Sequence, residues 1–162
     1  MTNITGTNGN DTLWGSSDSD TINGKAGNDT IYIYGNNYGS GGDTLTGGGG
    51  KDEFVYSSGN NYIITDFGGV GKGTNPTAAV IAEVDTLNFL IGGFTARNLL
   101  LTQNGNNLEI SFEGNADETR FNDAKVILQN FKLEDLDNLK ASGATPSRYC
   151  PLLFSDSNGR WG

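Results

Sequence analysis

Five aspartates recur at a regular interval near the start of the chain. They occupy the sixth position of the nine-residue phrases GTNGNDTLW, GSSDSDTIN, GKAGNDTIY, YGSGGDTLT and GGGGKDEFV. These aspartates are Asp11, Asp20, Asp29, Asp43 and Asp52. Carboxylates stacked close together repel one another unless a cation neutralises them, and calcium accepts roughly six to eight oxygen ligands in a flexible geometry. The spacing therefore predicts a row of calcium sites.

Each phrase combines a turn with a short strand. Positions one to five are rich in Gly, Asn and Ser, which favour tight turns with positive φ. Positions six to nine are β-prone, with a large apolar residue at position eight. These apolar residues are Leu13, Ile22, Ile31, Leu45 and Phe54. Two phrases close one flattened coil, and coils stack about 4.8 Å apart. A flexible linker has no need of a regular buried residue, so we expect an all-β, parallel roll.

Stacking pairs each phrase with the next but one. Asp11 is then expected to share an ion with Asp29, Asp29 with Asp52, and Asp20 with Asp43, which gives about three sites between coils. A five-residue insert, 33–37, separates the third phrase from the fourth. Asp18 replaces the usual glycine at position four of the second phrase, where it either adds a ligand or strains the turn.

The phrases follow the G-G-x-G-x-D-x-U-x pattern, and the chain here resembles the RTX family. Repeats of that family form the calcium-loaded β-roll of secreted bacterial toxins, serralysin-type proteases and lipases. The resemblance covers residues 4–55 closely and continues loosely to about residue 139. It implies that the aspartates supply side-chain oxygens and that backbone carbonyls supply most other ligands. The implied carbonyl donors are at Gly6, Asn8, Gly15, Ser17, Gly24, Ala26, Tyr38, Ser40, Gly47 and Gly49.

The rest of the chain is expected to form a cap. We assign 1–55 to the roll, 56–140 to a β-rich C-terminal capping region of the same module, and 141–162 to an irregular tail. A solenoid needs such a cap to stay soluble. The expected elements are strands at 54–56, 62–65, 84–91 and 125–131, a hairpin of 99–103 with 108–112, and a short helix at 133–139, while 77–84 has some helical propensity.

Two aspartates beyond the repeats are further candidate ligands. Asp66 precedes Phe67, and in serralysin-like modules the aspartate of such a D-F pair often belongs to another calcium site; its alternative role is to cap a turn. Asp85 opens a D-x-L-x-F phrase that follows the D-F loop in the family. The acidic cluster of Glu134, Asp135 and Asp137 is better explained as the solvated face of a helix.

Composition excludes several functions. The net charge is −9 and the isoelectric point about 4.2, which argue against nucleic acid or an anionic membrane as partner and suit a protein that takes up cations. The chain has no histidine, so Ser-His-Asp and Cys-His catalysis are excluded and we predict no enzyme activity. The single Cys150 cannot form an internal disulfide. No apolar run is long enough to span a membrane.

The expected function is that of a non-catalytic calcium-binding module of a secreted bacterial protein, which folds when calcium binds between its coils. The N-terminus lacks a standard signal peptide, and the RTX resemblance implies type I secretion to the extracellular space. The expected partners are calcium ions and either a polysaccharide or a parent or partner secreted protein.

Three alternatives remain open. The first is a calcium-dependent carbohydrate-binding accessory module, like the R-modules of alginate epimerases, whose aromatic residues Trp14, Tyr32, Tyr34 and Tyr38 stack on sugars. The second is a small enzyme, which the absence of histidine disfavours. The third is an ice-binding solenoid, for which two threonines per face, from Thr12, Thr21, Thr30 and Thr44, make too short an array.

Overall fold

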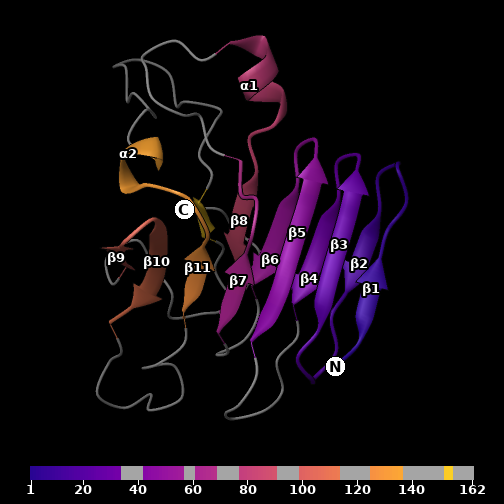
Figure 1. The fold of residues 1–162 in the computed structure, drawn as a ribbon, viewed down its shortest axis with the longest axis horizontal. Coiled ribbons are helices and arrows are strands. Elements are labelled where there is room, and N and C mark those ends of the chain that lie inside the picture. Colours follow the sequence, from indigo (N-terminus) through magenta and orange to yellow (C-terminus); the bar gives the residue numbers. More distant parts are fainter. Residues whose placement is uncertain are drawn as a thin grey trace.

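Two β-sheets face each other across the core of the protein (Figure 1). The computed structural model describes residues 1–33, 42–56, 61–68, 77–90, 99–113 and 125–136, and the backbone of 152–154. The first sheet has the order β1 (Asn3–Thr5), β3 (Thr21–Ala26), β5 (Asp43–Gly49), β7 (Tyr62–Ile64), β11 (Val126–Leu128), β10 (Asn107–Phe112) and β9 (Leu99–Asn104). The second has the order β12 (Leu152–Phe154), β8 (Thr86–Phe89), β6 (Glu53–Tyr56), β4 (Thr30–Ile33) and β2 (Thr12–Trp14).

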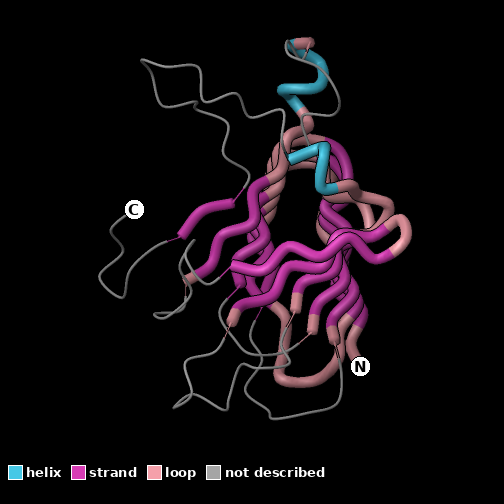
Figure 2. Tube along the Cα trace, turned by 90° about the vertical axis from the view of Figure 1, so that its left-hand side faces the viewer, coloured by secondary structure: helices cyan, strands magenta, loops and turns pink. Residues whose placement is uncertain are grey.

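Successive strands alternate between the sheets, so the chain winds as a parallel roll. Figure 2 looks along this roll and shows the strands of the two sheets on either side of the core. Ile22 pairs with Ile4 and with Leu45, and Ile31 pairs with Leu13 and with Phe54. Each coil therefore contains two phrases, as the sequence predicted. The insert between phrases three and four does not change the pairing of the strands. Phrase two still pairs with phrase four, and phrase three with phrase five, in the register that aligns equivalent positions.

The apolar residue of each phrase points into the core. Ile22, Ile31, Leu45 and Phe54 are all completely buried. Their neighbours in sequence are partly exposed on the outside of the roll, for example Thr21 and Thr44. Period-two alternation on a parallel sheet therefore fills a narrow core, with one such residue from each of β3 and β5 and two, Ile31 and Ile33, from β4.

The strands after the repeats extend both sheets. β7 and β8 add one strand to each, and β10 then runs antiparallel to β11 and to β9. The hairpin of β10 and β9 confirms the one expected from the sequence, and Gly105 supplies the positive φ of its turn (φ 59°). Aromatic rings seal this end, with Phe89 packed edge-on against Phe112 and Phe67 against Phe131.

Two short helices flank the added strands. α1 (Ala78–Ala82) is capped by the Thr77 side chain, which accepts a hydrogen bond from the Val80 N–H. α2 (Leu133–Leu136) lies beside β9. The sequence offered no signal for strand β12, which lies within 141–162 and pairs with β8. No helix in the part of the chain that the structure describes is long and apolar enough to cross a membrane.

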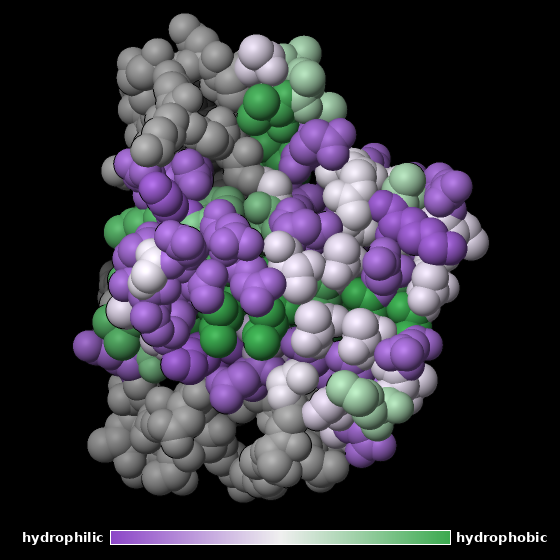
Figure 3. All heavy atoms as spheres, in the orientation of Figure 1, coloured by the Kyte–Doolittle hydropathy of each residue, from purple (hydrophilic) through white to green (hydrophobic). Residues whose placement is uncertain are grey.

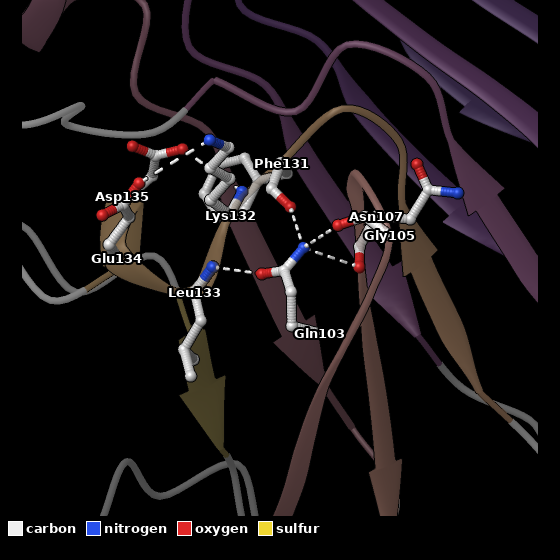
Figure 4. Close-up of polar contacts among 8 residues, drawn as sticks. All are labelled: Gln103, Gly105, Asn107, Phe131, Lys132, Leu133, Glu134 and Asp135. Atoms are coloured by element: carbon white, nitrogen blue, oxygen red, sulfur yellow. Dashed lines mark hydrogen bonds and ion pairs between the residues drawn. The ribbon is translucent and has the colours of Figure 1, made fainter.

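A glutamine ties α2 to the hairpin (Figure 4). The Nε2 group of Gln103 donates to the carbonyl oxygens of Asn107 at 3.0 Å, Gly105 at 3.2 Å and Phe131 at 3.3 Å. Its Oε1 accepts a hydrogen bond of 2.8 Å from the Leu133 N–H at the start of α2. The side chain of Gln103 therefore joins the hairpin turn, the segment that follows β11 and the first turn of α2.

Candidate metal centres

Four aspartates form a ladder along one edge of the roll: Asp11, Asp29, Asp52 and Asp85. The backbone N–H of Asp11 donates to Oδ1 of Asp29 at 2.8 Å, and that of Asp29 donates to Oδ1 of Asp52 at 2.9 Å. The N–H of Asp52 donates to Oδ1 of Asp85 at 2.9 Å. We call this row the long ladder. The carboxylates of Asp29, Asp52 and Asp85 therefore each bridge to the coil before them through Oδ1, which leaves the Oδ2 oxygen facing the turn of its own coil.

Glycine at position one of a phrase leaves space in the turn for backbone and carboxylate oxygens. A Cβ on Gly6 would lie 2.6 Å from the carbonyl oxygen of Gly24 and 2.7 Å from Oδ2 of Asp11. A Cβ on Gly24 would likewise meet the carbonyl oxygen of Gly47 and Oδ2 of Asp29. Glycine at position one thus allows a carbonyl of one coil and a carboxylate of the coil before it to approach the same point. Oxygens converging in this way form a cradle for a hard cation.

Two carboxylate oxygens of the long ladder have no hydrogen-bond partner. Oδ2 of Asp29 and Oδ2 of Asp52 are buried and accept no hydrogen bond, and the two residues are only 1% and 2% exposed. A buried, unsatisfied charged oxygen costs about 1–3 kcal/mol or more. A bound calcium ion would remove that cost, so these residues fit the ion.

At the open end of the ladder a side chain satisfies the equivalent oxygen. Oδ2 of Asp11 accepts hydrogen bonds from the Thr7 N–H at 2.6 Å and the Thr7 hydroxyl at 3.0 Å. Ser16 does the same for Asp20 on the opposite edge, at 2.7 and 2.6 Å. In the first two phrases the aspartate Oδ2 oxygen therefore has hydrogen-bond donors within its own turn, whereas Oδ2 of Asp29 and of Asp52 has none.

The opposite edge carries a short ladder of only Asp20 and Asp43. The N–H of Asp20 donates to Oδ1 of Asp43 at 2.8 Å, and the N–H of Thr2 donates to Oδ1 of Asp20 at 2.9 Å. The next residue in this row is Tyr62, which pairs with Asp43 and is buried. The short ladder therefore has one gap between aspartates and the long ladder has three.

Burial perturbs the acidity of the inner carboxylates. It raises the pKa of Asp52 to about 6, with a further contribution from the negative charges of Asp29, Asp66 and Glu83. Burial also raises the pKa of Asp43 to about 6 and that of Asp85 to about 7. At Asp20 burial acts in the same direction but is outweighed by hydrogen bonds from Ser16 and Thr2, so its pKa is lowered.

The last gap of the long ladder is closed by residues outside the nonapeptides. Asp66 accepts hydrogen bonds from the backbone N–H groups of Gly47 at 3.0 Å and Gly48 at 2.8 Å, which is the turn-capping role considered for it. Oδ2 of Asp85 accepts from the Gly68 N–H at 2.7 Å. Oε2 of Glu83 accepts from the Gly50 N–H at 2.9 Å.

Sequence reasoning missed Glu83. Glu83 lies two residues before Asp85, just as Gly50 lies two residues before Asp52. If Asp85 is taken as position six of a phrase, Glu83 therefore occupies position four of that phrase. The sequence between Phe67 and Glu83 is too long to be recognised as one turn, which concealed this correspondence.

The remaining candidates differ in their contacts. Asp18 is exposed and belongs to neither ladder; its N–H donates to the Ser16 hydroxyl at 3.2 Å. The carbonyl of Gly49 accepts a hydrogen bond of 2.9 Å from the Gly27 N–H. Asn8, Gly15, Ser17 and Ala26 lie in or beside the turns, and Tyr38 and Ser40 fall outside the described residues. No three carboxylates or thiols of the described segments converge on one point, so a bound cation would draw on backbone carbonyls as well.

Comparison with known proteins agrees with this geometry. Residues 3–32 and 39–63 match the family model of the RTX calcium-binding nonapeptide repeat, in four copies. These segments are RTX repeats, and repeats of this kind bind calcium. No curated protein sequence matches the chain.

The chain is also similar to solved structures. One is the AlgE6R3 subunit of the mannuronan C5-epimerase from Azotobacter vinelandii, with a TM-score of 0.50 and 20% identity, covering 88% of this chain and 82% of the subunit. Another is the extracellular lipase LipA from Serratia marcescens, with a TM-score of 0.42 and 24% identity, covering 84% of this chain and 20% of the lipase. The likeness to AlgE6R3 supports the RTX β-roll as the fold of this chain.

Proposed function

We propose that this chain is a non-catalytic module that folds when calcium binds between its coils. The observation that carries the proposal is the pair of buried carboxylate oxygens, Oδ2 of Asp29 and Oδ2 of Asp52, which have no hydrogen-bond partner. A charged oxygen is retained in a buried position when a cation satisfies it. The RTX repeats around these two residues agree with calcium as that cation.

Four ions are expected from the two ladders. On the long ladder they lie between Asp11 and Asp29, between Asp29 and Asp52, and between Asp52 and Asp85. On the short ladder one ion lies between Asp20 and Asp43. The carbonyls of Gly24 and Gly47 supply backbone ligands in the first two gaps, because each faces the preceding turn. In the last gap, between Asp52 and Asp85, Asp66 and Glu83 instead hold the turn in place by accepting hydrogen bonds from the backbone N–H groups of Gly47, Gly48 and Gly50.

The ladder geometry couples the sites. Asp29 and Asp52 each line two gaps, so an ion in one gap orders the carboxylate that lines the next. Binding energy then becomes folding energy, and occupancy of one site favours occupancy of its neighbours. Without calcium the stacked negative charges oppose the roll, in a chain whose net charge is −9.

We place this folding outside the cell. RTX repeats are typical of secreted proteins, and low intracellular calcium would keep the chain loose until it is exported. Type I secretion is the route that the family suggests. A calcium-induced roll would then form only where the ion is abundant.

Circular dichroism of the EDTA-stripped chain, titrated with calcium and separately with magnesium, tests the proposal. We expect a cooperative gain of β signal with calcium, a much weaker response to magnesium, and about four ions per chain by calorimetry. Magnesium is the control because it demands a smaller, octahedral site. A stripped chain that is already fully folded, with no calorimetric calcium binding, would overturn the proposal.

One observation favours a second function, carbohydrate binding. Trp14 and Tyr32 stack in parallel on the outside of the second sheet, with ring centroids 4.0 Å apart, and Trp14 is 50% exposed. Aromatic surfaces of this kind bind the apolar face of a sugar ring. As an accessory module of a polysaccharide-modifying enzyme, the roll would hold its substrate there. Calorimetric titration with neutral and uronic oligosaccharides tests this function, with Trp14→Ala as the variant expected to lose binding.

A further inference from the structure

The first sheet presents a flat outer face on which two adjacent rows of side chains carry no charge. Strands β1, β3, β5 and β7 lie side by side, and every second residue on them points outward. The outward residues of the first part of each strand form two rows across the strands, and Lys25 follows these rows on β3. One row is Asn3, Thr21, Thr44 and Ile63, and the other is Thr5, Asn23, Thr46 and Thr65. Figure 3 shows pale side chains of near-neutral hydropathy gathered over β3 and β5.

This array is larger than the sequence suggested. Only position seven of each phrase was counted there, which gave two threonines per face. The structure adds position nine and continues the rows, beyond the five phrases, to Ile63 on β7 and to Thr65 directly after it. Five of the eight residues are threonines and two are asparagines, and none of the eight is charged, although the chain carries 29 charged side chains.

The spacing of the array matches a water network. Neighbouring strands place equivalent side chains about 4.8 Å apart. In tetrahedral water, two oxygens that share a hydrogen-bonded neighbour lie about 4.5 Å apart, given O···O distances of about 2.75 Å. Threonine on a strand has restricted χ1 rotamers, so its hydroxyl and methyl are held in fixed positions. The hydroxyls of Thr46 and Thr65, which are neighbours in the second row, hydrogen-bond to each other at 2.8 Å.

We propose that this face, defined by the two rows, binds ice through a layer of water molecules ordered between its hydroxyl and amide groups. A flat polysaccharide is the competing partner, but such surfaces are usually met by aromatic side chains. Aromatic residues lie instead on the opposite sheet, at Trp14 and Tyr32, and the described outward residues of β1, β3, β5 and β7 include none. The two rows exist only in the folded roll. This inference therefore rests on the proposed function, in which calcium folds the chain.

Ice-crystal shaping and thermal hysteresis, measured by nanolitre osmometry on the calcium-loaded full chain, test the proposal. We expect the chain to shape growing crystals and to show a hysteresis gap absent from buffer. Thr44→Tyr, in the middle of one row, should abolish both effects. Thr30→Tyr is the matched control, because it has the same position in its phrase but lies on the second sheet, and it should retain both. Both variants must give the circular dichroism spectrum of the parent.

The outcomes separate this inference from the calcium proposal. A chain that folds with calcium but leaves ice unshaped overturns the ice-binding face alone, as does equal loss in Thr44→Tyr and Thr30→Tyr. Co-sedimentation with cellulose or chitin without any effect on ice also overturns it in favour of a polysaccharide. A chain that shapes ice equally well in EDTA supports the face and contradicts calcium-dependent folding.

Discussion

The backbone nitrogen of Asp52 lies 2.9 Å from Oδ1 of Asp85, a residue 33 positions later in the chain. The same contact joins Asp29 to Asp52 across 23 positions and Asp11 to Asp29 across 18. Asp85 therefore stands in the long ladder although it belongs to no nonapeptide. The row of aspartates to which we assign calcium therefore extends one coil beyond the residues that match the repeat model, which end at residue 63.

Replacing Asp85 tests whether this extra coil holds an ion. Asp85→Asn keeps the shape of the side chain but removes its charge, so we expect one calcium ion fewer per chain and a lower Tm in calcium. In EDTA we expect little difference in the β signal of the two chains, because removal of a charge that burial disfavours is offset by the loss of one acceptor: an amide cannot accept from both the Asp52 and the Gly68 N–H. Calorimetry and thermal unfolding measure the two effects in calcium. Asp18→Asn, an exposed change outside both ladders, should leave the stoichiometry as it is; equal ion loss in the two variants would contradict the assignment.

A methyl group placed between the coils should block a site directly. Gly24→Ala brings a Cβ against the carbonyl oxygen of Gly47 and the carboxylate of Asp29, so we expect a loss of about 1–3 kcal/mol in stability and a weaker calcium response. Gly9→Ala is the matched control, because its Cβ would meet only the Thr7 hydroxyl at 3.8 Å, an ordinary contact. Urea unfolding in calcium compares the two. Similar free energies of unfolding for both variants would show that the crowding at Gly24 has no role in ion binding.

The stripped chain should become less stable as pH rises. The pKa values of Asp43, Asp52 and Asp85 are raised from 3.8 to about 6, 6 and 7 in the folded chain, so the folded state holds more protons than the unfolded state between these limits. Their stabilising contribution is complete below about pH 4 and is lost as pH rises through about 6 to 7. A shift of two units corresponds to about 2.7 kcal/mol per group. The lowered pKa of Asp20 has the opposite effect on stability, but that effect changes with pH only below about the ordinary pKa of 3.8 and so does not alter this window.

Calcium should reverse this pH dependence, because the ion binds the deprotonated carboxylates. Circular dichroism in EDTA, at about pH 5 and about pH 7.5, measures how much of the stripped chain is rolled, and urea unfolding measures the stability of the calcium-loaded chain at the same two pH values. We expect the stripped chain to have more β signal at the lower pH and the calcium-loaded chain to have the larger free energy of unfolding at the higher pH. A stripped chain whose stability rises with pH would contradict the burial of these carboxylates.

The repeats made most of the roll predictable. A fixed position for aspartate and for one apolar residue sets the pairing of Asp11 with Asp29 and of Ile22 with Leu45, since any other register would expose the apolar row. The insert at 33–37 did not disturb this, because the phrase resumed in the same phase. Local pattern also sufficed for the hairpin at Gly105, where the turn chemistry lies in adjacent residues.

Other features depend on contacts that no local pattern encodes. Tyr62 ends the short ladder because it takes the place of an aspartate beside Asp43, and its sequence environment resembles that of any buried strand residue. Glu83 reaches Gly50 only because the chain returns to the roll after a detour that includes α1. The two rows of the flat face required the register of four strands. Position in the coil, rather than residue type, therefore decides these roles.

The hairpin of β9 and β10, within the cap, should contribute stability without binding an ion. Gln103→Ala removes the only side chain that joins the hairpin turn to the start of α2 in Figure 4, so we expect a loss of about 1 kcal/mol. The side chain is exposed, so water replaces part of what is lost, and the effect should stay near this size. Gln129→Ala, an exposed glutamine after β11, is the control and should change stability less. Thermal unfolding and calorimetry measure the two variants. A lower calcium stoichiometry in Gln103→Ala would mean that the cap and the ladders are not independent, because Gln103 touches neither ladder.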